Sequence, residues 1–181
     1  SHEIINTGNN FVLHIPEDIS NFTKFPVGSL VWEDKEQSYR VQVQDEYIVY
    51  SGPGGTILRK EILSLGKKFI HVHPGWLPKF RGSTTIYYSM LVNSTVGASV
   101  IIFEEGIDEG PILYKNEYKI SEKNIDFDYV LDPLVRAKTL IEFFKMENIS
   151  TTKQKDDDES STFYIIHPLL KHISVINHNR K

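Results

Sequence analysis

The chain has 181 residues, of which 40% are hydrophobic and 24% are charged, as in a folded domain with its own core. Its formal net charge of −4 disfavours a nucleic-acid partner, because domains that bind phosphate backbones are usually basic. The sequence contains no cysteine, which excludes disulfides, cysteine nucleophiles and cysteine–zinc sites. We therefore expect a single domain over residues 1–181.

No apolar run approaches the roughly 20 residues that a membrane-spanning helix needs. The first residues show neither the basic segment nor the apolar segment of a signal peptide. We therefore expect a cytoplasmic protein without a membrane partner.

The first 46 residues give weak structural signals. Short apolar stretches predict strands at 11–15, 27–32 and 39–43. No glycine-rich strand–loop–helix unit is visible in this region.

From residue 47 onward, predicted strands and helices alternate. Continuous apolar runs predict strands at 47–50, 69–73 and 98–103, and a weaker alternation predicts one at 112–120. Apolar residues at helical spacing predict helices over 57–65, 84–92 and 131–146. This alternation is typical of an α/β fold in which a mostly parallel, Rossmann-like sheet is flanked by helices.

The chain becomes polar after the last predicted helix. Residues 147–162 include four consecutive acidic side chains, 156–159, and predict a solvated acidic loop. Residues 163–181 open with an apolar run and predict a strand followed by a tail. This tail has three alternative roles, namely packing, closure of a site, or a homodimer contact, and packing is the favoured one.

Two histidines stand at the end of a predicted strand. His71 and His73 are two residues apart, so their side chains share one face, and Pro74 ends the strand. In open α/β sheets, ligands bind beyond the carboxyl ends of strands. Asp108 follows another buried strand, in a turn bounded by Gly106 and Gly110. We therefore expect the histidines and Asp108 to converge at one edge of the sheet.

Such a group suits acyl transfer to nitrogen without a covalent enzyme intermediate. A neutral histidine accepts a proton from the attacking amine, and a carboxylate on its other nitrogen fixes the tautomer. A second polar donor stabilises the developing oxyanion. Two alternatives stay open at this point, because a His-x-His pair with an Asp is also a metal-ligand set and because either histidine can be purely structural.

The segment from His71 to Gly82, HVHPGWLPKFRG, resembles the central motif of the folate-dependent formyltransferase family. That motif is Asn-x-His followed by Leu-Pro-x-x-Arg-Gly, with an Asp in a Gly-x-Asp-x-Gly turn about 35 residues later. Here Asp108 lies 35 positions after His73 (108 − 73). Two motifs at this separation are specific, and the resemblance covers roughly residues 47–120. Within the family it is closest to the sugar-nucleotide N-formyltransferases.

The resemblance implies roles for the converging residues. His73 would be the general acid/base, with Asp108 as its partner and no metal ion. The family's catalytic Asn falls at His71, which is a departure, although a histidine can still donate one hydrogen bond to the formyl oxygen. The formyl donor implied is 10-formyltetrahydrofolate.

The resemblance also implies where the folate pterin binds. It maps the pterin to a loop and helix start and to the Asp108 turn, that is, to Gly54, Gly55, Ile57, Leu58 and Ile107. Simple turn geometry is the alternative for the two glycines, and core packing is the alternative for Ile57 and Leu58.

The acceptor is inferred from the branch of the family. Arg81-Gly82 looks like the tRNA and sugar branches, but only 61 residues follow Ile120 (181 − 120), fewer than the additional domain of the tRNA enzymes. We therefore expect a small amine, a nucleotide-linked amino sugar, and no nucleic acid. Arg81, Tyr87 and Tyr88 are candidates to contact the acceptor, or else form a salt-bridged cation and a packed helix face.

Family members begin with a complete βαβ half, whereas only 50 residues precede the loop at Ser51. We therefore expect a shortened N-terminal half. Three other functions remain open, namely a formyl-folate hydrolase, a metal-dependent hydrolase, and a catalytically impaired folate-binding protein.

Overall fold

The structure is a computed structural model that describes residues 3–5, 12–14, 30–32, 39–41, 47–50, 60–64, 66–155 and 160–180. The chain divides into two compact units, Ser1–Ile48 and Val49–Lys181, and each is described by itself. The single domain expected over residues 1–181 stays a prediction.

In the first unit, four short strands form two antiparallel pairs. β1 (Glu3–Ile5) pairs with β2 (Val12–His14), and β3 (Leu30–Trp32) pairs with β4 (Tyr39–Val41). β2, β3 and β4 fall within the three apolar stretches that predicted strands in this region.

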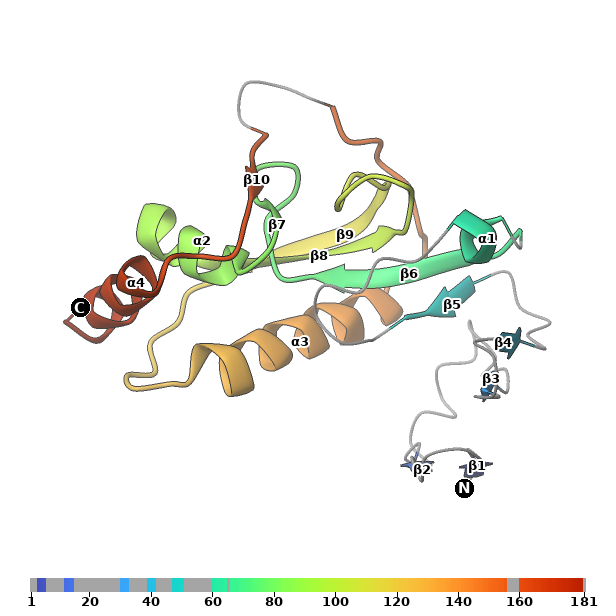
Figure 1. The fold of residues 1–181 in the computed structure, drawn as a ribbon, viewed down its shortest axis with the longest axis horizontal. Helices are drawn as coiled ribbons and strands as arrows, with labels where there is room; N and C mark the ends of the chain where they lie inside the picture. Colours follow the sequence, from blue (N-terminus) through green and yellow to red (C-terminus); the bar gives the residue numbers. More distant parts are fainter. Residues whose placement is uncertain are drawn as a thin grey trace. The chain divides into compact units, whose positions relative to one another are not determined.

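A four-stranded sheet carries the predicted motifs (Figure 1). Its strand order is β5 (Tyr47–Val49), β6 (Lys68–His73), β8 (Val96–Ile102) and β9 (Ile112–Tyr118). β6 runs antiparallel to β8, and β8 runs antiparallel to β9, so the expectation of a mostly parallel sheet is wrong for both pairs. β8 is almost wholly buried, and burial on both faces makes a strand apolar whatever its direction.

Helices cover this sheet, and the predicted α/β class is confirmed. α3 (Asp132–Phe144) lies along one face of the sheet and contacts β6, β8 and β9 (Figure 1). Its buried residues Val135, Thr139 and Phe143 are four apart, which places them on one side of the helix. α2 (Thr85–Asn93) contacts β8, and α1 (Lys60–Leu63) is short.

The C-terminal segment departs from the prediction. The expected strand from residue 163 is limited to β10 (Thr162–Phe163), which pairs parallel with β7 (Arg81–Gly82). The expected tail is instead helix α4 (Pro168–Arg180), which packs against α2. Proline is favoured at the first position of a helix, and this is the signal at Pro168 that the sequence interpretation missed.

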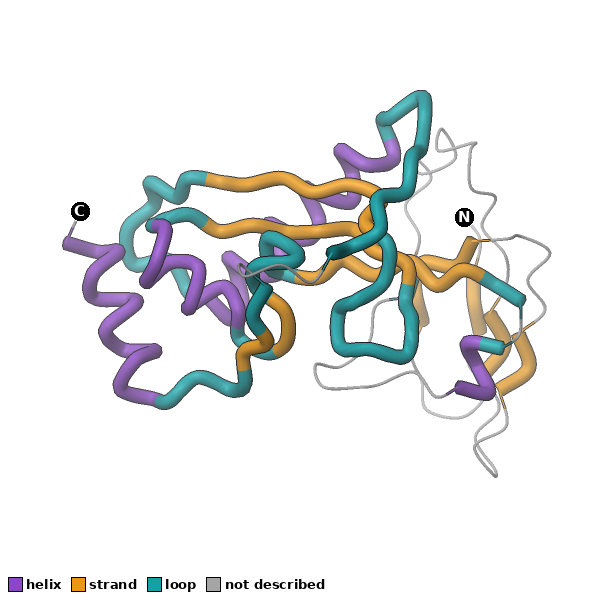
Figure 2. The backbone as a smooth tube through the Cα atoms, turned by 90° about the horizontal axis from the view of Figure 1, so that it is seen from above, coloured by secondary structure: helices purple, strands orange, loops and turns teal. Residues whose placement is uncertain are grey.

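The antiparallel pairing of β6 and β8 determines where the site lies. His73 at the end of β6 is opposite Ser99 near the start of β8. Residues 74–95 therefore leave and re-enter the sheet at the same end, as Figure 2 shows from above.

Gly82 is required by the close approach of β10. Its φ is +94°, and a Cβ there would lie 2.1 Å from the carbonyl oxygen of Phe163. We predict that Gly82→Ala lowers the free energy of unfolding by about 3 kcal/mol or more, because strain and a backbone clash act together. Urea denaturation measures this change.

Gly66 offers a matched control for that prediction. Its φ is +71°, but a Cβ there would meet nothing within 4 Å. Gly66→Ala should therefore cost only the backbone strain, about 1 kcal/mol. Equal losses for the two variants would contradict the assigned clash with Phe163.

Candidate active site

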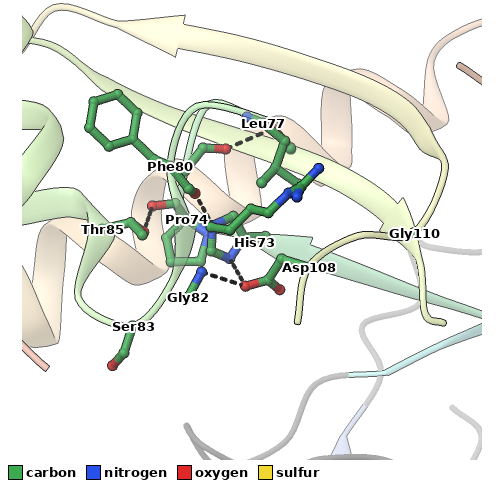
Figure 3. A network of polar contacts seen from close by, with 12 residues as sticks. His73, Pro74, Leu77, Phe80, Gly82, Ser83, Thr85, Asp108 and Gly110 are labelled. Carbon is green, nitrogen blue, oxygen red and sulfur yellow. Dashed lines mark hydrogen bonds and ion pairs between the residues drawn. The ribbon is translucent and has the colours of Figure 1, made fainter. Parts of the chain in front are cut away.

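The imidazole of His73 and the carboxylate of Asp108 meet at the end of β6 (Figure 3). His73 Nδ1 lies 3.3 Å from Asp108 Oδ2, and the His73 side chain is 3% exposed. Asp108 comes from the turn between β8 and β9 and has a left-handed φ of 54°. The structure thus brings together the two residues that the sequence interpretation paired, while their catalytic roles stay predictions.

Asp108 also contacts β7, which follows His73 in the chain. The backbone N–H of Gly82 donates a hydrogen bond of 2.9 Å to the same oxygen, Oδ2 (Figure 3). A carboxylate held between a histidine ring and a backbone amide has its orientation fixed. Asp108 therefore positions the His73 ring and β7 at the same time.

The second nitrogen of His73 faces a backbone carbonyl. His73 Nε2 lies 2.7 Å from the carbonyl oxygen of Phe80. Because a carbonyl oxygen only accepts hydrogen bonds, Nε2 carries the proton in this contact. Gly75 makes the contact possible, since a Cβ there would lie 2.5 Å from Nε2 and 2.4 Å from the Phe80 oxygen.

Two hydroxyls fix the loop that follows His73. The Ser99 hydroxyl donates to the carbonyl of Gly75 at 2.7 Å and accepts from the N–H of Leu77 at 3.2 Å. The Thr85 hydroxyl donates to the carbonyl of Pro74 at 2.6 Å (Figure 3). Ser99 and Thr85 are fully buried, so these bonds are protected from water and hold the loop in one conformation.

His71 lies beside the pair in an aromatic environment. Its ring stacks on Phe103 with centroids 4.7 Å apart and planes 21° apart. Its Nδ1 is buried and has no hydrogen-bond partner in the described part of the chain. Burial, followed by repulsion from His73, lowers the pKa of His71 from 6.5 to about 4. His71 is therefore neutral at pH 7 and keeps one N–H, and the ring also makes a hydrogen bond with the Tyr50 backbone.

The three residues predicted to contact the acceptor have different environments. Tyr87 is buried against Phe127 and donates a 2.8 Å hydrogen bond to Asp128, so it packs α2 onto its neighbours. Tyr88 is partly exposed and contacts the ring of Phe163 at 4.5 Å between centroids. For Tyr87, the structure therefore supports the alternative interpretation, in which the side chain belongs to a packed helix face.

Arg81 is also buried, at 5% exposure, next to the turn that carries Asp108. Its Nε donates to Gln154 at 3.1 Å, and its Nη1 lies 3.9 Å from a carboxylate oxygen of Glu109. The guanidinium thus contacts Gln154 and Glu109, the residue that follows Asp108, and is held within a polar network rather than on the surface.

The predicted folate contacts are only partly covered by the structure. Gly54, Gly55, Ile57 and Leu58 lie outside the described residues. Ile107 is 52% exposed immediately before Asp108, so an apolar side chain is accessible at this turn.

Sequence reasoning missed several residues that shape the site. Ser99 is a polar residue inside the apolar run 98–103, and that interruption is a usable signal. The contact of His73 with Phe80 is made by the main-chain carbonyl of Phe80, and such a contact leaves no pattern of side chains in the sequence. Gln154 lies in the polar loop predicted at 147–162, where no periodicity distinguishes it from its neighbours.

Within the described residues, no group of three or more His, Cys, Asp or Glu side chains is arranged to hold a metal ion. In the part of the chain that the structure describes, no helix is both long enough and apolar enough to cross a membrane.

Comparison with known sequences decides the family. Residues 15–129, more than half of the chain, match the family described as formyl transferase. The chain belongs to this family. It is 30% identical over 151 residues to the methionyl-tRNA formyltransferase of Wolbachia sp. subsp. Drosophila simulans (strain wRi). This alignment covers 81% of this chain and 50% of that protein. A second such protein, from Ehrlichia canis (strain Jake), is 31% identical over 74% of this chain and 45% of its own length. The chain thus spans about half the length of these relatives.

Solved structures show the same fold. PseJ of Anoxybacillus kamchatkensis, a formyltransferase in complex with UDP-4,6-dideoxy-4-formamido-L-AltNAc and tetrahydrofolate, aligns with a TM-score of 0.58 at 19% identity, over 84% of this chain and 82% of its own. A 4-N formyltransferase from Francisella tularensis aligns with a TM-score of 0.52 at 18% identity, over 73% and 59%. The predicted formyltransferase-type fold is therefore confirmed.

The low pKa of His71 predicts a pH dependence of stability. The folded protein keeps His71 neutral down to about pH 4, whereas the unfolded chain binds a proton near 6.5. Stability is therefore lost as the pH falls from 7 towards 4, by about 3 kcal/mol in total from this residue. Urea denaturation at pH 7, 5.5 and 4.5 measures the loss.

His71→Asn is the matched variant for that measurement, because it introduces the family's residue and removes the titrating group. We expect the variant to lose about 3 kcal/mol less than the unsubstituted protein over this pH range. Parallel stability curves for the two proteins would show that His71 is not desolvated in the folded state.

Proposed function

We propose that this chain carries the catalytic site of an N-formyltransferase that moves a formyl group from 10-formyltetrahydrofolate to the amine of a small acceptor. The observation that carries the proposal is the contact of His73 with Asp108. These two residues belong to the two motifs by which the sequence resembles the folate-dependent formyltransferases. Family membership supports the same reaction class.

His73 acts as the general base in this proposal. The attacking amine loses a proton as its nitrogen bonds to the formyl carbon, and an imidazole nitrogen at that point accepts it. Asp108 stabilises the imidazolium that forms and keeps the ring oriented. When the bond from the formyl carbon to the donor nitrogen breaks, the same proton is available to the leaving nitrogen.

His71 supplies a hydrogen bond to the formyl oxygen, on which negative charge develops, when its N–H turns from the Tyr50 backbone to the substrate. A neutral donor in a desolvated position stabilises such charge more than one exposed to water. The low pKa of His71, due mainly to burial, keeps the ring neutral at pH 7.

The contact of His73 with Phe80 sets a condition for turnover. Nε2 is the nitrogen turned away from Asp108, and it is bonded to the Phe80 carbonyl at 2.7 Å. An amine reaches Nε2 only after this contact opens, and Nε2 accepts the amine proton only in the tautomer whose single proton is on Nδ1, facing Asp108. Binding of acceptor therefore includes a displacement of the Phe80 carbonyl from His73.

The donor site lies on the Asp108 side of the pair. Ile107 offers exposed apolar surface there, and by resemblance Gly54, Gly55, Ile57 and Leu58 complete the pterin site. Tetrahydrofolate in the related PseJ structure supports the choice of donor.

A nucleotide-linked amino sugar is the preferred acceptor. PseJ was solved with a formamido sugar nucleotide, and the alignment covers 82% of that protein. The net charge of −4 also disfavours tRNA. Arg81 and Tyr88 remain acceptor-contact candidates, although the sequence relatives named above are methionyl-tRNA formyltransferases and make charged initiator tRNA the second candidate.

Substitution of the catalytic pair tests the mechanism. We expect His73→Ala and Asp108→Asn each to lower kcat for formamide formation by about 100-fold or more, since proton transfer and its orientation are lost. Glu105→Gln is the matched control, because this carboxylate is in the same turn but 69% exposed. Formamide formation that survives both substitutions would remove the pair from the mechanism.

An acceptor panel tests the substrate class. The protein is incubated with 10-formyltetrahydrofolate and either UDP- or dTDP-linked amino sugars or methionyl-tRNA, and formamide product is measured by mass spectrometry. We expect product with at least one amino-sugar nucleotide and none with the tRNA. Release of formate at one rate with and without any amine would instead identify a formyl-folate hydrolase.

A further inference from the structure

Gln154 occupies the space between the catalytic turn and Arg81. Its side-chain amide donates two hydrogen bonds, to the carbonyl of Asp108 at 2.7 Å and to that of Gly110 at 2.8 Å. Its oxygen accepts the bond of 3.1 Å from Arg81 Nε. One side chain thus joins the turn that carries Asp108 to β7, the strand that contains Arg81 and Gly82.

The amide of Gln154 can adopt only one orientation in this setting. Rotation by 180° would place its oxygen against two carbonyl oxygens and its NH₂ group against the guanidinium of Arg81. All three interactions would become repulsive. The two donated bonds and the accepted bond therefore specify a glutamine rather than a glutamate of equal size.

The backbone around Gln154 is held in place. Two residues earlier, Thr152 exchanges two backbone hydrogen bonds of 2.8 Å with Ile112 at the start of β9. The Gln154 side chain is therefore delivered to the turn from a fixed point on the sheet.

The Asp108 turn needs such support. Asp108 has a left-handed φ of 54°, which is unfavourable for a residue with a Cβ. The carbonyls of Asp108 and Gly110 both lie in the second half of the turn, so two donors from one amide fix the backbone from Asp108 to the end of the turn. Strained backbone persists only where surrounding contacts hold it.

We propose that Gln154 is a positioning residue that sets the Asp108 carboxylate against His73, a role that rests on the proposed function of the pair. Gln154 touches neither the formyl group nor the amine. It acts through the main chain of Asp108, and it aligns Arg81 with the same turn.

The decisive variant is Gln154→Glu, which keeps the size and the bond from Arg81 but removes both donors to the turn. We expect kcat to fall by about 10- to 100-fold with KM changed less than threefold, because a small displacement of a catalytic group has effects of this size. The acidic limb of the pH–kcat profile should shift as well, since Asp108 no longer holds His73 in the same geometry. Gln154→Ala should show the same kcat loss, and Lys153→Ala, an exposed neighbour, should match the unsubstituted protein.

A second readout does not require turnover. Hydrogen exchange of the Gly82 amide, followed by NMR, reports its bond to Asp108, and we expect it to accelerate about tenfold or more in Gln154→Glu. Exchange at Val100 in β8 should be unchanged, which distinguishes the effect from a general loss of stability. If the unsubstituted protein fails to transfer formyl groups, the proposed function fails while this exchange measurement still tests Gln154. Unchanged Gly82 exchange and an unchanged pH profile in Gln154→Glu would overturn the positioning role.

Discussion

The site depends on one oxygen atom. Asp108 Oδ2 is 3.3 Å from His73 Nδ1 and accepts a hydrogen bond of 2.9 Å from the Gly82 amide. These contacts join three segments, namely the end of β6, strand β7, and the turn that follows β8. Side-chain exposure is only 13% for Asp108 and 3% for His73, so water competes weakly for either contact. The geometry that formyl transfer would need is therefore set by a carboxylate that water does not readily displace.

Part of this arrangement was predictable from the sequence. The spacing of His73 and Asp108 and the strand-ending Pro74 singled out two chemical groups, and the structure brings those groups together. The reason differs from the expected one, because antiparallel β6 and β8 end at opposite ends of the sheet and the turn after β8 carries Asp108 back to His73. The strand direction was not predictable, because burial on both faces produces the same apolar runs in antiparallel β8 as in a parallel strand. Contacts through main-chain atoms, such as that of Phe80, and single contacts from a polar loop, such as those of Gln154, have no pattern to detect.

His71 shows how one departure from a family motif changes the physics of a site. An asparagine is neutral at every physiological pH, whereas a protonated histidine would add a positive charge to a buried location. Burial and the neighbouring ring resolve this conflict by lowering the pKa of His71 to about 4. The stacked ring of Phe103 adds apolar surroundings that disfavour the charged form.

The order of the contacts along the chain has a consequence for biosynthesis. Gln154 lies 46 positions after Asp108, and Ser161 and Phe163 bind the backbone of Arg81 and Ser83 from still farther along. A nascent chain that has left the ribosome only through β9 possesses both His73 and Asp108 but lacks the contacts that fix their loops. Formation of an ordered site is thereby deferred to the last stage of translation of this segment.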